Sequence, residues 1–200
     1  MRISTLLITS VVTVCAVLHT APSEACINGV ELRVDDGKRL VARADKALQR
    51  GRHKDAIRAA DMALRRSGPA RVHQRAALIR ALAVIRSDGR HALRTDAGKL
   101  KGRAAVAEAT RILAGETKIP GSGEPRWKAA LAEGLEATGQ TDEALAILED
   151  LAGRDLLPDA RAFAALARLR AESGNAPGAN TAAERCRQMG GKGLCPVPRS

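Results

Sequence analysis

Aromatic side chains are almost absent from this chain, and their scarcity constrains the fold more than any other feature. Among 200 residues the only aromatics are Trp127 and Phe163, although hydrophobic residues of all kinds make up 45%. A core must therefore be built from alanine and leucine, and small alanines let helices approach one another closely. Alanine is also the strongest helix former, and the residues that favour strands are scarce after residue 20. The composition predicts an all-α fold.

Apolar residues recur with the period of an α-helix from residue 37 onward. One face of a first helix is marked by Leu40, Val41, Ala44, Ala47 and Leu48. Gly51 interrupts the pattern, and a second helix then runs as far as Ser67-Gly68-Pro69, which predicts a helix hairpin. Further helices are expected over residues 71–86 and about 102–114. The polar residues between them, 87–101, are expected to form an enlarged turn that makes this second hairpin irregular.

The turns between paired helices share a spacing of small residues. A glycine is followed after five residues by alanine, and two further small or apolar residues follow after four and then three more. The pattern occurs as Gly51, Ala56, Ala60 and Ala63, as Gly139, Ala144, Leu148 and Leu151, and as Gly174, Ala179, Ala183 and Cys186. The last two glycines lie 35 residues apart. The chain therefore resembles the tetratricopeptide-repeat family, whose unit is about 34 residues long.

This resemblance implies a short α-solenoid of antiparallel helix hairpins over residues 37–189, because one hairpin cannot bury its apolar face without a neighbour. Members of the family bind peptides or proteins along the groove lined by the first helix of each pair. The basic candidates that the resemblance implies for such a groove are Arg39, Arg43, Lys46, Arg75 and Lys128. Trp127 is expected to fill the hairpin core; the alternative is that it anchors a ligand on the concave face.

The first 25 residues are typical of a secretory signal peptide. Arg2 provides a positive charge, an apolar run extends from Ile3 to Leu18, and Ser23-Glu24-Ala25 matches the small-x-small pattern that signal peptidase accepts. The strongest apolar stretch is shorter than the ~20 residues that a spanning helix needs, which favours cleavage over a membrane anchor. We therefore expect an exported protein, in the periplasm or outside the cell. The alternative is a lipoprotein anchored through Cys26.

The two ends of the mature chain carry no helical pattern. Residues 26–36 contain a turn signal at Asn28-Gly29 and are expected to form an extended or looped lead-in. Residues 190–200 form a Gly- and Pro-rich tail. Cys186 and Cys195 enclose three glycines, so the chain can turn back and a disulfide between them is the preferred pairing in an exported protein. Cys26 remains an alternative partner for either cysteine.

Charge is strongly positive and unevenly spread, with a formal net value of +11. Residues 37–114 contain twenty Lys or Arg against six Asp or Glu, whereas residues 115–159 contain four against ten. The basic segment either suits an anionic partner or reflects the excess of arginine in the composition. Nucleic acid is disfavoured, because the basic stretch has no aromatic residue for base stacking. The acidic segment is expected to neutralise part of the basic one, within a chain or between copies.

No arrangement of residues predicts catalysis. Asp88, His91 and Asp96 carry metal-binding groups, but their polar segment is typical of a solvated turn. His53 and His73 lie in predicted helices without a nucleophile or an orienting acid in their motifs. We expect no cofactor and no metal, and we interpret the chain as a non-catalytic adaptor or scaffold of the bacterial cell envelope that binds a protein or peptide. The alternative is an envelope ligand-binding protein or enzyme that holds an anionic partner with residues 37–114.

Overall fold

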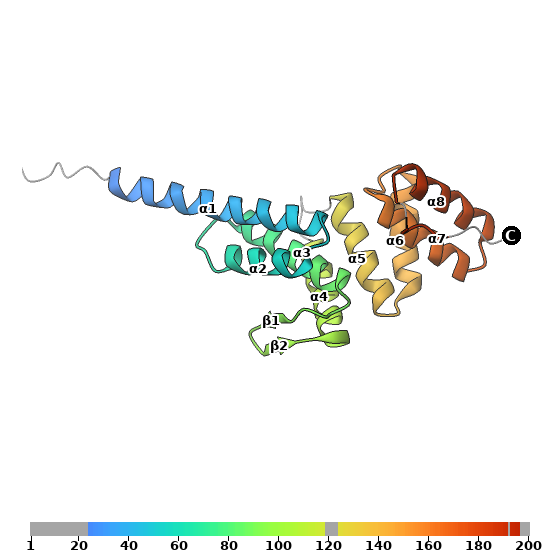
Figure 1. Ribbon diagram of the computed structural model, residues 1–200, viewed down its shortest axis with the longest axis horizontal. Helices are drawn as coiled ribbons and strands as arrows, with labels where there is room; N and C mark the ends of the chain where they lie inside the picture. Colours follow the sequence, from blue (N-terminus) through green and yellow to red (C-terminus); the bar gives the residue numbers. More distant parts are fainter. Residues whose placement is uncertain (1–23, 119–123, 192, 197–200) are drawn as a thin grey trace, which may run out of the picture.

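The computed structural model describes residues 24–118, 124–191 and 193–196, with side chains from Asp36 onward. Within these residues the chain forms eight helices and one two-stranded sheet (Figure 1). The helices are α1 Glu24–Gln49, α2 His53–Leu64, α3 Ala70–Arg86, α4 Gly102–Glu116, α5 Pro125–Ala137, α6 Thr141–Gly153, α7 Ala160–Glu172 and α8 Ala176–Gln188; the strands are β1 Leu93–Thr95 and β2 Gly98–Leu100. The all-α fold expected from the composition is confirmed.

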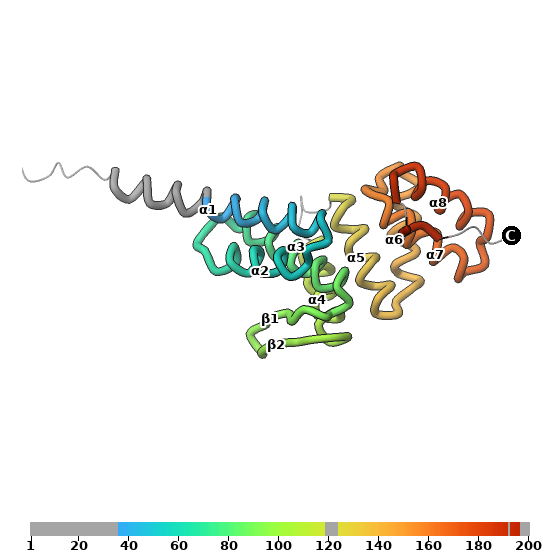
Figure 2. Tube along the Cα trace, viewed as in Figure 1, coloured from blue at the N-terminus to red at the C-terminus, as the bar shows by residue number. Residues whose placement is uncertain are grey.

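Neighbouring helices pack in pairs that follow one another along the long axis of the molecule. Figure 2 shows the trace running in sequence order from α1 and α2 at one end to α7 and α8 at the other. The pairs are α1 with α2, α3 with α4, α5 with α6 and α7 with α8. The first helices of successive pairs also touch, since α1 contacts α3, α3 contacts α5 and α5 contacts α7. This series is the short solenoid of antiparallel hairpins that the sequence predicts.

The N-terminal segment differs from the expectation. Residues 26–36, expected to be extended or looped, belong to α1, whose backbone is helical from Glu24. Once a helix exists, each added residue gains a backbone hydrogen bond, and this gain overrides the local turn signal at Asn28-Gly29. The predicted signal peptide lies outside the described residues apart from its last two positions, and the Cys26 side chain is not among those described. None of the described helices is long and apolar enough to cross a membrane.

Three tight turns repeat one backbone geometry. Gly51, Gly139 and Gly174 each adopt a positive φ, of +69°, +85° and +82° respectively. In each turn the residue after the glycine donates its N–H to the carbonyl five residues earlier, at 2.9 Å for Arg52 and 2.8 Å for Gln140 and Asn175. This pattern closes a helix through a left-handed residue, which glycine adopts without a steric cost. The glycines singled out by their spacing therefore occupy equivalent places in three helix pairs.

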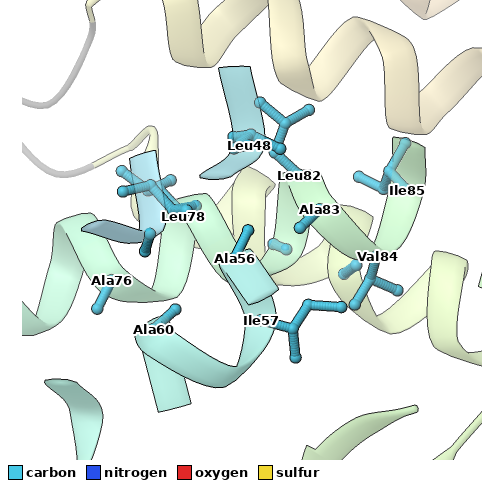
Figure 3. Close-up of a cluster of buried hydrophobic side chains, with 14 of the residues drawn as sticks. Leu48, Ala56, Ile57, Ala60, Ala76, Leu78, Leu82, Ala83, Val84 and Ile85 are labelled. Carbon is cyan, nitrogen blue, oxygen red and sulfur yellow. The ribbon is translucent and has the colours of Figure 1, made fainter. Parts of the chain in front are cut away.

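Alanine and aliphatic side chains form a core that divides into two clusters. Figure 3 shows part of the first cluster, where Ala56 and Ala60 of α2 lie beside Leu78 and Leu82 of α3. All four side chains are at most 2% exposed. The second cluster is built in the same way from α5, α6, α7 and α8. The small side chains let neighbouring helices pack closely without aromatic fillers.

Helix α5 belongs to both clusters. Trp127 and Ala130 pack in the first cluster, whereas Ala129, Ala132 and Leu135 pack in the second. Trp127 is 3% exposed, so it fills the core as expected. The two faces of this one helix therefore join the N-terminal and C-terminal halves of the solenoid.

A β-hairpin connects α3 to α4 and accounts for the irregular second pair. The expected enlarged turn contains an antiparallel ladder in which Leu93 pairs with Leu100 and Thr95 with Gly98. Leu93 is fully buried in the first core cluster, so the hairpin is fixed to the helices. The ends of the connection meet where the Gly102 N–H donates to the Gly89 carbonyl at 2.9 Å. Strands of three residues are too short to show the alternation by which sequence analysis recognises them.

A disulfide joins Cys186 of α8 to Cys195 of the tail, with an S–S distance of 1.99 Å. Cys186 is fully buried. Gly191 lies against the bridge so closely that an added Cβ would come 2.7 Å from the Cys195 sulfur, 2.8 Å from the Cys186 sulfur and 2.9 Å from Ala160 Cβ at the start of α7. The pairing preferred from the sequence is confirmed, and it ties the tail to the last helix pair.

Removing the disulfide is expected to lower the free energy of unfolding by about 2–3 kcal/mol, because the bridge restricts a short loop of the unfolded chain. The variant Cys186→Ala/Cys195→Ala and the reduced natural chain should both unfold at lower urea concentration than the oxidised protein. The double variant serves as its own control, since a reductant should leave its midpoint unchanged. A natural chain whose midpoint is indifferent to reductant would contradict the prediction.

Candidate functional site

A groove between α1 and α3 gathers basic side chains around an apolar floor. Its volume is about 620 Å³. Val41 and Val72 form the floor, and Lys46, Arg71 and Arg75 are exposed around them. The remaining lining residues are Lys38, Ala42, Asp45 and Gln49. The groove lies on the first helices of the first two pairs, the surface on which the resemblance implies partner binding.

Helical spacing produces this arrangement. On α3, Arg71 and Arg75 are four residues apart, and on α1 Lys38 and Lys46 are separated by two helical turns, so each pair lies on one face. The two helices meet closely beside Lys38 and Arg71, since a Cβ added at Gly37 would lie 3.2 Å from Val72 Cγ1. The glycine therefore permits the close approach of α1 and α3 that forms one boundary of the groove.

Among the side chains that line the groove, Asp45 is the one acid, and arginines neutralise it. Arg126 of α5 donates to both carboxylate oxygens of Asp45, with Nη1 3.1 Å from Oδ2. Arg75 Nη2 lies 3.9 Å from the same Oδ2. The Arg126 guanidinium also stacks over Trp127, 4.7 Å from the ring centroid, which fixes its position. The groove therefore keeps a net positive charge.

Ion pairs also tie together the first helices of the later pairs. Arg86 of α3 donates to both carboxylate oxygens of Glu133 in α5, from Nε at 2.9 Å and from Nη2 at 2.6 Å. The same Nη2 lies 3.6 Å from Asp159, the residue that caps α7. Burial acts to lower the pKa of Arg86, but the hydrogen bonds and charges of the two carboxylates outweigh it and raise this pKa. The guanidinium therefore stays charged inside the solenoid.

These contacts show that the basic segment 37–114 and the acidic segment 115–159 partly neutralise each other within one chain. Arg86 comes from the first segment, while Glu133 and Asp159 come from the second. A further pair joins α5 to α7, where Arg168 donates to the two carboxylate oxygens of Glu136 at 2.9 and 3.0 Å. Ion pairs between oppositely charged segments thus help to hold successive helix pairs together.

The structure brings together two of the five basic residues that the resemblance implies for partner binding. Lys46 and Arg75 line the groove, whereas Arg39 and Arg43 are exposed on α1 outside its lining, and Lys128 is half-buried on α5. Sequence reasoning did not name the other two basic lining residues, Lys38 and Arg71. Their helical spacing from Lys46 and Arg75 was the signal that would have found them.

The three side chains of segment 87–101 that carry metal-binding groups do not gather into a metal site. Asp88 and Asp96 are exposed, and His91 is half-buried. Across the described residues, no three His, Cys, Asp or Glu side chains gather in a way that would hold a metal ion.

The two helical histidines have different surroundings. His73 Nε2 lies 2.7 Å from the Arg66 carbonyl, a contact that joins α3 to the segment that follows α2. His53 begins α2, and its pKa is lowered first by burial and then by the positive charges of Arg161, Arg86, His91 and Arg90. Both causes disfavour the charged imidazolium of His53.

Comparison with known proteins finds no match. No protein-family model matches the chain, and neither a curated protein nor a solved structure matches it. The residues and charges of the groove therefore carry the functional interpretation.

Proposed function

We propose that this protein is a non-catalytic binding protein that holds an acidic peptide segment of a partner protein in the groove between α1 and α3. The groove supports this proposal because an apolar floor is surrounded by Lys38, Lys46, Arg71 and Arg75, while its one acid is already paired with Arg126. A peptide can place aliphatic side chains on the apolar floor and carboxylates beside the basic residues, so it complements both the floor and the charged rim of the groove. Complementary charge also speeds encounter and selects the partner.

Two other observations support an exported repeat protein. The serial helix pairs and the equivalent turns at Gly51, Gly139 and Gly174 agree with the tetratricopeptide resemblance, and members of that family bind peptides on the first helices. The disulfide between Cys186 and Cys195 suits an oxidising compartment. The proposal therefore includes export by the N-terminal signal and action in the bacterial cell envelope.

Selection of a random peptide library on the immobilised protein tests the proposal. Enriched peptides should combine Asp or Glu with aliphatic residues, and a fluorescein-labelled member then reports Kd by fluorescence anisotropy. The variant Lys46→Gln/Arg75→Gln should raise Kd roughly tenfold or more, because it removes two charge-assisted hydrogen bonds. Arg39→Gln/Arg43→Gln removes the same charge outside the groove lining and should leave Kd within about twofold.

The control variant makes the test decisive. Equal weakening by both double variants would show that net charge, and not the groove, governs binding. Enriched peptides without an excess of acidic residues would also overturn the proposal. Circular dichroism and the urea midpoint of each variant establish that it is folded before its Kd is compared.

A further inference from the structure

A second basic recess lies between α2 and the β-hairpin and shares none of the groove's lining residues. Its volume is about 390 Å³. Six cationic side chains line it: Lys54 and Arg58 from α2, Arg65 at its C-terminal cap, and Arg90, Arg94 and Lys101 from the connection that carries the hairpin. Segments far apart in the sequence therefore direct positive charge toward one space.

The α2 side of the recess is a row of charges. Lys54, Arg58 and Arg65 lie on one helical face, four and then seven residues apart. At the rise of an α-helix this row is about 16 Å long from its first residue to its last. A single small anion would reach only part of the row, whereas a ligand with several linked anionic groups would reach most of it.

Asp61 is the one acid that lines the recess, and it is already neutralised by the protein. Arg80 Nη1 lies 3.2 Å from Asp61 Oδ1, and both side chains are largely buried. The same Nη1 donates to the Arg94 carbonyl at 3.4 Å, so the ion pair also holds the hairpin backbone beside α2. The positive charge of the recess is therefore not cancelled by its own carboxylate.

Arg90 donates from Nε to the Ser87 carbonyl at 3.0 Å, whereas the other five cations have no partner within the described residues that would explain their convergence. Within the part of the chain that the structure describes, the side chains of Lys54, Arg58, Arg65, Arg94 and Lys101 make no ion pair or hydrogen bond. Like charges brought together repel one another and destabilise the folded state. The hairpin does not depend on them, because the buried Leu93 already fixes it to the core.

The chemistry of the lining selects the ligand. Arginine presents a planar fork of donors that binds phosphate oxygens in pairs. Trp127 and Phe163 are absent from the lining, and the one ring in it is the half-buried imidazole of His91, so phosphate groups match the six cations better than nucleobases do. Its apolar wall is limited to Ile57 and Ala92, which is too little for an acyl chain.

From these contacts we propose that the recess between α2 and the hairpin binds a short chain of linked phosphates, independently of the peptide groove. Such a ligand presents several closely spaced oxyanions along the row of Lys54, Arg58 and Arg65, and Arg90, Arg94 and Lys101 close over it from the opposite wall. The separate phosphates of a membrane surface are the other source of this chemistry, and the test distinguishes them from the linked phosphates of a free ligand.

Isothermal titration calorimetry of the full protein with orthophosphate, pyrophosphate and tripolyphosphate tests the proposal. Affinity should rise with each added phosphate and fall steeply between about 50 and about 300 mM salt. Arg58→Gln/Arg94→Gln should raise the Kd for tripolyphosphate roughly tenfold or more. Arg39→Gln/Arg43→Gln, with the same loss of charge outside both sites, should leave it within about twofold.

Further measurements separate the alternatives. If Arg58→Gln/Arg94→Gln fails to fold, Lys54→Gln/Arg65→Gln replaces it and leaves the hairpin untouched. Equal weakening by the control variant, or equal affinity for all three phosphates, would overturn the proposal. A different outcome is that the protein floats with phosphatidylglycerol vesicles only when Arg58 and Arg94 are present, and shows no measurable binding of tripolyphosphate. That result would assign the recess to a membrane surface and would overturn the proposal of a free oligophosphate ligand. Unchanged peptide anisotropy with the recess variant shows that the two sites are independent.

Discussion

Replacing Gly89 by alanine is expected to lower the free energy of unfolding by about 3 kcal/mol, a large effect for the addition of one methyl group. Gly89 has a φ of +65°, a conformation that costs other residues about 1 kcal/mol. An added Cβ would also lie 2.3 Å from the Gly102 carbonyl oxygen and 2.7 Å from its carbon. Backbone atoms cannot move aside as a flexible side chain does, so the two ends of the hairpin connection must separate.

Gly102→Ala provides a matched control for this prediction. Gly102 also has a positive φ, of +57°, but nothing lies within 4 Å of an added Cβ. Its replacement should therefore cost only the backbone contribution, about 1 kcal/mol. Urea denaturation followed by circular dichroism measures both variants. Equal losses for the two substitutions would show that the close approach of Gly89 to Gly102 does not contribute to stability.

Replacing Arg86 by methionine is expected to destabilise the protein by about 3 kcal/mol, because it leaves Glu133 as an unpaired, largely buried carboxylate. The Arg86 and Glu133 side chains are only 13% and 14% exposed, and they share two hydrogen bonds. Arg86 also contacts Asp159, so its loss loosens α3 from both α5 and the start of α7. The urea midpoint should fall without a large change in the slope of the transition.

The double variant Arg86→Met/Glu133→Leu distinguishes the cost of an unpaired carboxylate from the loss of the ion pair itself. With both charges removed, no largely buried carboxylate is left unpaired, because Asp159 is 46% exposed and still accepts from the Ala162 N–H. Stability should therefore lie within about 1 kcal/mol of the natural protein. Arg111→Met is a surface control: Arg111 pairs with Glu108 but is 74% exposed, so its loss should leave the urea midpoint almost unchanged. A single variant Arg86→Met as stable as the Arg111 variant would contradict the prediction.

The helices and their turns could be read from the sequence because their signals are local. The alanines of α2 recur at helical spacing, and Gly51, Gly139 and Gly174 end helices by a geometry that depends on neighbouring residues only. The disulfide could be predicted for the same reason, since Cys186 and Cys195 lie nine positions apart across three glycines.

Contacts between residues far apart in the sequence could not be predicted in this way. Asp45 and Arg126 are 81 positions apart, and Arg86 and Glu133 are 47 apart, so no local pattern links them. The charge imbalance predicted that such neutralisation occurs but not between which residues. The basic recess was hidden because its walls belong to α2 and to a hairpin whose strands were not predicted.

Helix α5 has a consequence for the way this protein unfolds. The two core clusters serve segments of roughly 60–80 residues, a size at which an independent domain is only marginally stable. Because α5 gives one face to each cluster, loss of either cluster exposes apolar surface on the helix that the other still needs. We therefore expect the shared helix to couple the two halves, so that the whole solenoid unfolds in a single urea transition.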